Sequence, residues 1–589
     1  MVIMKIQDYD NKMLDLLNDP TYKILRKDPT STIQKLTNNM AKRLADLKLI
    51  DRHTLHKLQT HTSTCPRIYG QPKAHKPNLP LRPVVPNITA PTYQLSKFIA
   101  NILQTTFTSQ HNIKDSFNFV EEITTITIPP EHVLVSFDVV SLFTNIPKEL
   151  VIRNIIFRWT DIKKGTDINL DVFLEMVELC LNNSYFMFRD KYYQQTFGTV
   201  MRIADYVMED LLDTVITKLN FTIPVLKKYV DDLFLVLPKP LVEHTLNIFN
   251  QFNQHLQFTM EIEKSGKLPF LDTLIIRKED HTLRTVWYSK PISSGRLLNY
   301  NSFHPTNMKL NVASNFIKRV MQLTTDTPIE QQKHVIFQNL RRNDYPSALI
   351  NRLMNRIKTE LITGQQHHGH HPLPTSSPPL PAPTPTEPQD QPPPLSIPNI
   401  QILTPSIIAI LRRDFPLIKI ATRTTQNIKT LLKSVKDPVS PLDQHNVIYS
   451  IPCIDCDNVY IGMTTNQLKK RLSGHRSNVN KLIETQTNTL NLDVIQANTA
   501  LVQHMIDTEH TFDLEGTKTV VRTLRPTALP VLEMCHIQNT PHTVNYRTDV
   551  DNLNTTYAGI LHTVKTTLMC RKQSRHTTRN TITDTIGQT

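Results

Sequence analysis

The feature that most constrains the fold is a pair of adjacent carboxylates, Asp231 and Asp232, at the head of an apolar run. Residues 233–237 read Leu-Phe-Leu-Val-Leu, and their β-forming side chains predict a buried strand with the two acids at a hairpin turn on the rim of its sheet. Two crowded carboxylates repel each other unless a cation neutralises them. The pair therefore predicts a metal site at the sheet edge, with a third acid nearby.

A candidate for the third acid is Asp138, which interrupts the apolar, β-branched segment 132–143. Burying an isolated charge costs several kcal/mol or more, so a charge in such a strand is expected to have a partner. If this strand lies beside the hairpin strand, the three aspartates converge on one point. Such a point suits two Mg²⁺ ions about 3.5–4 Å apart, which stabilise the attacking and leaving oxygens of a phosphoryl displacement.

These two acidic segments resemble the catalytic motifs of reverse transcriptases, in the version carried by Penelope-like retroelements. The motifs are Tyr-Val-Asp-Asp at 229–232 and Ser-Phe-Asp-Val-Val-Ser-Leu-Phe-Thr-Asn-Ile-Pro at 136–147. Two unrelated acidic loops are the alternative interpretation. The resemblance implies a right-hand polymerase with fingers, a ferredoxin-like palm and a thumb, in which Asp138, Asp231 and Asp232 hold two Mg²⁺ ions.

The resemblance extends to a basic, proline-containing segment at 65–86, which is similar to the fingers of the same family. Its prolines give the backbone an extended path. The resemblance implies that Lys73 and Arg82 contact the triphosphate of the incoming nucleotide, and a basic loop in solvent is the alternative. Phe143 matches a bulky residue that lies against the sugar and favours deoxynucleotides. A core aromatic is the alternative for Phe143.

The chain departs from the family pattern after Met201. Gln195 and Gly198 match positions that contact nucleotide or nucleic acid, but Arg202 and Ile203 follow where the family has a longer loop. In the family, that loop shapes the floor under the nascent base pair. A degenerate copy that acts only as a nucleic-acid-binding protein or as a nuclease is therefore the alternative to an active polymerase.

Composition favours a polyanionic partner. The chain has 66 Lys and Arg residues against 52 Asp and Glu, a formal net charge of +14. At 589 residues the chain is too long for one hydrophobic core, and its length predicts about three or four domains. Six scattered cysteines indicate a reducing compartment, and no apolar run approaches the ~18–20 residues of a membrane span. We expect a soluble protein with no membrane partner, resident in the nucleus if it acts on chromosomal DNA.

A second site is predicted by two β-type segments, 446–452 and 458–464, each with one tyrosine and followed by a basic helix from Leu468. This order resembles a GIY-YIG endonuclease, although the first box, 447–449, lacks its leading glycine. Core tyrosines of a β-hairpin are the alternative. The roles implied by the resemblance are Tyr449 and Tyr460 near the attacking water, Arg471 on the scissile phosphate, Glu533 on one Mg²⁺, and Asn545 on nucleic acid. A carboxylate-bound metal and an arginine together offset charge that builds on phosphoryl oxygens.

Between the two tyrosine boxes, Cys453 and Cys456 form a C-x2-C knuckle of the kind that binds Zn²⁺. Penelope-like nucleases carry a Cys-Cys-His-His set at this place. The resemblance implies a structural zinc held by both cysteines, by His475 and by either His504 or His510. Two free thiols are the alternative.

The predicted architecture is α+β and multidomain, because the proline-rich stretch 372–398 cannot form a core and reads as a stiff linker. It would join the polymerase to a small α/β GIY-YIG nuclease. The thumb is expected to offer Lys309, Lys318, Arg319, Arg341 and Arg342 to phosphates. The expected segments are a helical and fingers region (1–130), palm (131–280), thumb (281–362), His- and Pro-rich linker (363–398), connector (399–440), nuclease (441–570) and tail (571–589).

Together the motifs predict an RNA-directed DNA polymerase and DNA-nicking endonuclease of a retrotransposon, acting in target-primed reverse transcription. The expected partners are an RNA template, a DNA target and primer, and deoxynucleoside triphosphates. The expected cofactors are two Mg²⁺ ions in the polymerase site, one Mg²⁺ in the nuclease site and a structural Zn²⁺. A nuclease whose front half serves as a scaffold is a further alternative.

Overall fold

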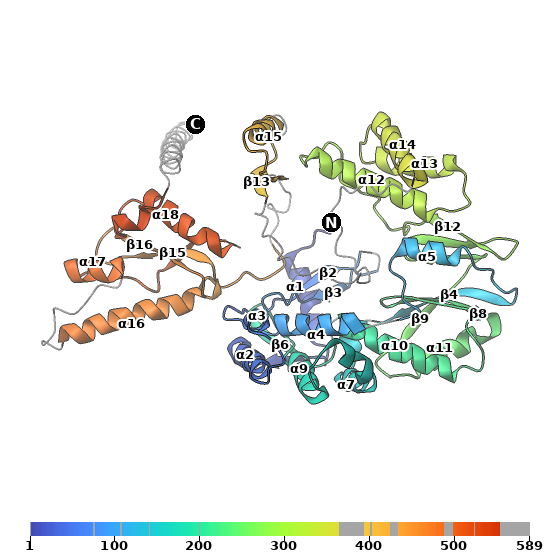
Figure 1. The fold of residues 1–589 in the computed structure, drawn as a ribbon, viewed down its shortest axis with the longest axis horizontal. Coiled ribbons are helices and arrows are strands. Elements are labelled where there is room, and N and C mark those ends of the chain that lie inside the picture. The colour runs from blue at the N-terminus through green and yellow to red at the C-terminus, as the bar shows by residue number, and fades with distance from the viewer. Residues whose placement is uncertain are drawn as a thin grey trace, which may run out of the picture.

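The computed structural model describes residues 2–74, 77–106, 109–140, 142–198, 201–363, 394–400, 403–424, 434–487, 499–523 and 525–553. Most of the expected linker over 363–398 and all of the expected tail over 571–589 lie outside these residues. Figure 1 shows a large body that ends at α14 and a smaller C-terminal unit, drawn in orange and red. In the described part of the chain, no helix combines the length and hydropathy that crossing a membrane requires.

The centre of the large body is a four-stranded antiparallel sheet with the order β7-β8-β4-β9. Helices separate β4 from the β7–β8 hairpin, and α11 separates β8 from β9. This βαββαβ arrangement is that of a ferredoxin-like unit, so the predicted topology of this sheet is confirmed. The bounds are β4 (His132–Val139), β7 (Val225–Tyr229), β8 (Asp232–Pro238), α11 (Val242–Asn250) and β9 (Phe258–Ile262).

The two faces of this sheet pack against different partners because side chains alternate along each strand. Val135, Phe137 and Val139 face a layer of helices and form the largest core. Leu134 and Phe234 face a second core, shared with α5 and with β10–β12. The helices of this part of the chain are α4 (Tyr93–Thr106), α5 (Ser116–Ile123), α6 (Leu142–Asn145), α7 (Lys148–Phe157), α8 (Trp159–Ile162), α9 (Leu170–Asn182) and α10 (Met201–Lys218).

The N-terminal segment is helical, as predicted, except for one short strand. Helices α1 (Ile6–Leu17), α2 (Thr30–Asp46) and α3 (Arg52–Leu58) are joined by β1 (Tyr22–Leu25). Strand β1 pairs with β6 (Lys191–Gln195), which pairs in turn with β5 (Tyr185–Phe188). The strand was not predicted because its partner lies far along the sequence. A separate hairpin, β2 (Tyr69–Pro72) and β3 (Leu81–Val84), carries Arg82 and leads into Lys73.

After the central sheet, β10 (Lys267–Phe270), β11 (Thr273–Arg277) and β12 (Leu283–Trp287) form a three-stranded sheet. A turn at Ser265 and Gly266 precedes β10, and both residues have positive φ. Helices α12 (Thr306–Leu323), α13 (Ile329–Arg341) and α14 (Ser347–Thr363) then share one core.

Two of the cations expected to meet phosphates on these helices are engaged within the protein. Lys309 is buried, with its ammonium 5.6 Å from the centre of the Tyr300 ring. Arg319 pairs with Asp272 of the β10–β11 turn. The expectation that Lys309 is open to phosphates is therefore wrong, because the helix face that carries it packs inward.

The C-terminal unit is a three-stranded antiparallel sheet, with the order β16-β15-β17, surrounded by helices. Its two tyrosine boxes lie on the neighbouring strands β15 and β16, as predicted. The connector before it contains a parallel strand pair joined by a helix. The bounds are β13 (Leu395–Pro398), α15 (Leu403–Asp414), β14 (Ile420–Arg423), β15 (Val447–Pro452), β16 (Val459–Thr464), α16 (Leu468–Thr487), α17 (Ala500–Thr508), β17 (Lys518–Arg522) and α18 (Leu529–Asn539).

Candidate active sites and metal centre

Three aspartates meet at one end of the central sheet. Asp232 begins β8 and closes the hairpin against Tyr229, with Val230 and Asp231 as the turn. Asp138, near the end of β4, lies directly opposite Asp232 in the register. Residues directly opposite in an antiparallel pair have Cβ atoms about 4.5–5.5 Å apart, and like charges there are destabilising. The predicted neighbourhood of the two acidic strands is therefore present.

The electrostatics of this strand end favour a bound cation. Burial, followed by the charges of Asp231 and Asp138, raises the pKa of Asp232 to about 6, against a lowering contribution from Lys290. Asp138 and Asp232 lie opposite each other in the register and Asp231 lies in the adjoining turn, but the three carboxylates do not form a closed cluster. Within the described chain, the group whose ligand atoms all lie within 4.8 Å of one another is the cysteine and histidine set discussed below.

A cleft of about 940 Å³ opens over this end of the sheet. Small-molecule sites typically occupy about 300–1,000 Å³, so its size suits a nucleotide. Lys73, Arg82 and Phe143, the three predicted nucleotide contacts, do not line this cleft, and neither does Asp231. The lining includes Asp115, Asp138, Tyr229, Asp232, Lys290 and Arg319.

A buried ion group next to the hairpin turn links β7 to α10, and it was not predicted from the sequence. Lys228 is fully buried, with its ammonium 3.2 Å from Glu209 and 3.7 Å from Asp205, both on α10. Above it, Val230 has φ of 59°. A left-handed conformation at a β-branched residue costs about 1–3 kcal/mol, which the surrounding structure must supply. The sequence did contain a signal for this ion group: Lys228 lies inside an apolar strand, and Asp205 and Glu209 lie four residues apart in an apolar helical segment.

Gly198, Gln195 and Phe143 lie together beside α6. Gly198 has φ of 97°, and a Cβ added there would lie 2.5 Å from both the Phe143 carbonyl oxygen and Gln195 Nε2. Only glycine fits this position without strain. Phe143 is half-buried against the main core, in agreement with the core-aromatic alternative. Helix α10 begins at Met201, so few residues separate Gly198 from the helix.

We expect Asp232→Asn to stabilise the fold near neutral pH in magnesium-free buffer. The pKa of Asp232 is about 6 in the folded chain and near ~4 in an unfolded one, so folding favours the protonated acid. The ionised group therefore destabilises the fold above about pH 6, and this effect fades as the pH falls towards ~4.

Thermal unfolding at several pH values would measure this effect. The melting temperature of Asp232→Asn should exceed that of the native chain near neutral pH and match it near ~pH 4. Asp167→Asn, at an exposed position whose carboxylate has no described contact, is the matched control. An equal shift at both pH values would contradict the pKa assignment.

The second site is organised around Tyr449, which is fully buried on β15. Its hydroxyl accepts a hydrogen bond from Arg471 Nε at 3.1 Å and lies 2.8 Å from His475 Nε2. Arg471 and His475 lie one turn apart on α16. Arg471 is otherwise exposed, so its guanidinium remains accessible to a phosphate.

His475 was expected to bind zinc, and that expectation is wrong. Burial, followed by the charge of Arg471, lowers the pKa of His475 to about 4, so the ring is neutral near pH 7. A neutral imidazole can accept a hydrogen bond from the Tyr449 hydroxyl, and because burial raises the pKa of that hydroxyl, the proton stays on Tyr449. The sequence could not separate the two roles, because the spacing of the C-x2-C motif does not say which downstream histidine joins it.

Gly462 of the second box makes room for this arrangement. It lies opposite Tyr449 in the strand register, and a Cβ there would lie 2.6 Å from the Tyr449 hydroxyl. Tyr460, on the same strand, has its ring 5.5 Å from that of His475. A side chain at 462 would therefore displace one of the two tyrosines.

Glu533 and Asn545 have different surroundings. Burial raises the pKa of Glu533, and a hydrogen bond from the Met463 backbone and the charge of Arg471 oppose the rise. The Asn545 amide bonds both backbone groups of Ile461, at 2.9 and 2.8 Å. Asn545 therefore fixes strand β16 and is not poised towards nucleic acid. Asp549, which the sequence reasoning missed, also raises the pKa of Glu533.

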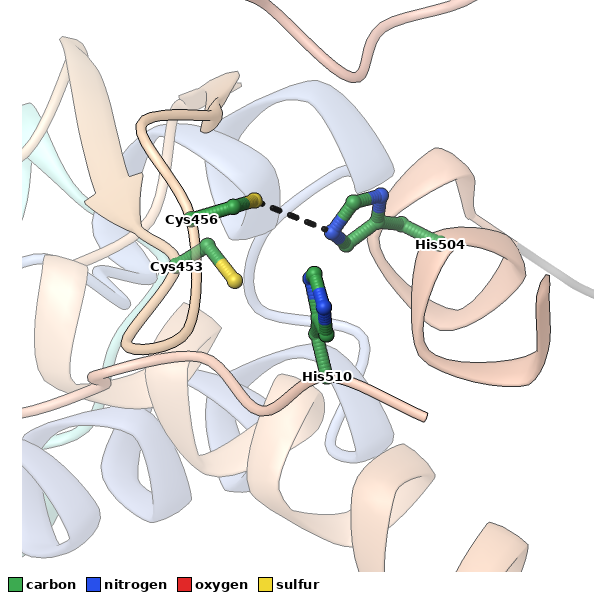
Figure 2. A group of neighbouring side chains, drawn as sticks. All are labelled: Cys453, Cys456, His504 and His510. Atoms are coloured by element: carbon green, nitrogen blue, oxygen red, sulfur yellow. Dashed lines mark hydrogen bonds between the residues drawn. The ribbon is translucent and has the colours of Figure 1, made fainter. Parts of the chain in front are cut away.

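A third cluster contains Cys453, Cys456, His504 and His510, whose ligand atoms all lie within 4.8 Å of one another (Figure 2). Cys456 Sγ lies 3.6 Å from His504 Nε2. Ligands about 2.3 and 2.05 Å from one ion at a tetrahedral angle lie about 3.5 Å apart, so this spacing fits zinc. Both candidate histidines belong to the cluster, and the four side chains could bind Zn²⁺.

We expect the native chain to carry one zinc here and Cys453→Ser/Cys456→Ser to lose it. Structural zinc contributes folding free energy of order 10 kcal/mol in small domains, so the unfolding transition of the C-terminal unit should fall in temperature. Elemental analysis and calorimetry would measure both effects. Cys535→Ser, a half-buried cysteine outside the cluster, is the control and should retain the metal. Unchanged metal content in the double variant would remove the zinc assignment.

The comparisons with known proteins give one family match and several distant structural similarities. The animal helix-turn-helix domain family matches residues 296–355, which include α12, α13 and part of α14. The comparison with curated proteins gave no significant match.

The similar solved structures include polymerases. Apo telomerase from Candida tropicalis is 10% identical, with a TM-score of 0.33, over 56% of this chain and 62% of that one. Telomerase from Candida albicans, in complex with a fragment of telomeric RNA, is 10% identical, with a TM-score of 0.33, over 56% of this chain and 64% of that one. The RNA-dependent RNA polymerase of a human picobirnavirus is 9% identical, with a TM-score of 0.35, over 60% of this chain and 77% of that one. The matched region spans less than two thirds of either telomerase chain, and the similarity is distant.

Proposed function

We propose that the chain is an RNA-directed DNA polymerase of a retroelement, with Asp138, Asp231 and Asp232 at its reaction centre. The observation that carries this proposal is the direct register pairing of Asp138 with Asp232 at the end of a ferredoxin-like sheet, beneath a cleft of about 940 Å³. Carboxylates concentrated on one strand end are the ligands that Mg²⁺ prefers.

The residues fit a divalent cation, because burial and the like charges of Asp231 and Asp138 raise the pKa of Asp232, and a cation would neutralise those charges. Asp138, Asp231 and Asp232 would hold it, and when bound it polarises phosphoryl oxygens and activates the attacking hydroxyl. Lys290 lines the same cleft and offsets charge on the triphosphate. Tyr229, at the base of the hairpin, forms part of the wall beside Asp232.

Primer extension on an RNA template tests the proposal. Deoxynucleotides should be incorporated opposite the template, and ribonucleotides should be incorporated less efficiently. Extension with ribonucleotides alone would instead support an RNA polymerase. Tight binding of primer and template without extension would favour the degenerate copy, in which few residues separate Gly198 from α10.

We infer a second activity, DNA nicking by the C-terminal unit. The observation in its favour is that the buried Tyr449 hydroxyl contacts both Arg471 and a neutral His475. The Tyr449 hydroxyl, held between Arg471 and His475, would orient the attacking water, while Arg471 offsets charge on the scissile phosphate. Glu533 would hold a divalent cation, which adds Lewis-acid stabilisation when bound. Conversion of supercoiled plasmid to open circles measures this activity.

The two activities together support target-primed reverse transcription, in which a nick exposes the 3′-hydroxyl that the polymerase extends. The partners would be an RNA template, a DNA target and primer, and deoxynucleoside triphosphates. Chromosomal DNA as target would place the protein in the nucleus.

A further inference from the structure

The C-terminal unit touches the large body through the start of α16. Gln467, the residue before this helix, donates its side-chain amide to the Ser63 carbonyl at 2.9 Å. Gln467 is 7% exposed and Ser63 is 3% exposed, so the contact is closed to solvent. One turn along, Lys470 Nζ donates to the His61 carbonyl at 3.0 Å. The segment 61–63 therefore receives two side chains from the base of α16.

A second contact lies at the tip of the β5–β6 hairpin. The Asp437 carboxylate accepts a hydrogen bond from the Arg189 backbone N–H at 2.8 Å and pairs with its guanidinium. The Asp437 side chain is only 8% exposed. Arg189 also binds Asp10 of α1 at 2.8 Å, and its φ is 46°. A nearly buried carboxylate requires such a partner, because leaving it unpaired is costly.

The position of these contacts gives them a functional meaning. Gln467 precedes Arg471 by four residues and His475 by eight, so the three lie along one stripe of the helical segment. The contact with segment 61–63 therefore constrains the helix that carries the proposed nuclease residues. In Figure 1 this end of α16 faces the N-terminal helices of the large body.

We propose that segment 61–63 and Arg189 form a docking surface for the chain's own C-terminal unit and the connector before it, and that docking sets the position of α16. The unit is recognised through the Gln467 amide and Lys470, and the connector through the nearly buried Asp437 carboxylate. The consequence for nicking rests on the proposed nuclease function, whereas the docking itself does not.

Cross-linking in the full chain tests the docking without any activity assay. His61→Cys and Asn466→Cys would be joined by a short bismaleimide, after a protease site has been placed within residues 372–393. A cross-linked chain keeps its full mass on a denaturing gel after cleavage. We expect a yield at least about five-fold above that of the control pair Lys333→Cys and Asn466→Cys, because docking raises the local concentration.

Adding Gln467→Glu and Asp437→Asn should lower that yield towards the control. The glutamate keeps the shape of glutamine but cannot donate to the Ser63 carbonyl, and the asparagine loses the charge that Arg189 pairs with. Gln331→Glu, on the exposed start of α13, should leave the yield unchanged. Equal yields for the test and control pairs, or a yield insensitive to both substitutions, would overturn the docking proposal.

The nicking assay on the same variants separates the two proposals. If docking positions α16, Gln467→Glu should lower the nicking rate several-fold, and Gln331→Glu should not change it. A chain that cross-links but never nicks would keep the docking and remove the nuclease assignment. A chain that nicks normally in the Gln467→Glu variant would show that α16 does not need the docking surface.

Discussion

Replacing Asp138 or Asp231 with asparagine is expected to lower the rate of primer extension by about 10³-fold or more. Asparagine keeps the size of the side chain but removes the negative charge that holds a divalent cation. Losing one preorganised electrostatic contact in an active site commonly costs about 10²–10³ in rate, and a metal ligand contributes at least as much. Single-turnover extension of a labelled primer on an RNA template would measure the loss.

The control for this prediction is Asp280→Asn, which removes a carboxylate from the turn between β11 and β12, outside the cleft lining. Its extension rate should stay close to that of the native chain. Binding of primer and template should survive in all three variants, because their phosphates are bound by cations elsewhere on the protein. Extension that is unchanged in Asp138→Asn would remove the polymerase assignment altogether.

Replacing Arg471 with alanine is expected to reduce plasmid nicking by about 10³-fold, because the change removes both the phosphate contact and the hydrogen bond to Tyr449. Glu533→Gln should have an effect of similar size by removing the charge that holds a cation. A metal titration would separate the two variants. More divalent cation should not rescue Arg471→Ala.

Arg476→Ala provides the matched control on the same helix, since Arg476 makes only an exposed ion pair with Glu515 among the contacts described. Exposed ion pairs contribute about 0–1 kcal/mol, so this variant should fold and nick normally. Nicking that persists in Arg471→Ala, or that disappears equally in Arg476→Ala, would argue against the proposed nuclease site.

Local patterns carried much of the correct prediction. The run after Asp232 and the segment around Asp138 are apolar enough to demand a buried sheet, and both are strands of one sheet. Pairings between distant segments were harder. Strand β1 went unpredicted because it acquires its hydrogen bonds from β6.

The same limit applied to the individual side chains of the sites. The spacing of Cys453 and Cys456 predicted a metal site, but the sequence did not show which of three downstream histidines would complete it. Folding placed His504 and His510 beside the thiols and put His475 against Tyr449. Likewise, Lys73 and Arg82 carry the right charge, yet they lie outside the cleft lining.

The sequence by itself determined which residues are acidic, apolar or metal-binding, and therefore which segments must be buried and which must find a cation. The tertiary structure alone decided which of these residues meet, including the support of the hairpin by Lys228 and the contact of Gln467 with Ser63. The physical reason is that burial and strand period act over a few neighbouring residues, whereas the pairing of charges and ligands depends on segments that only the folded chain brings together.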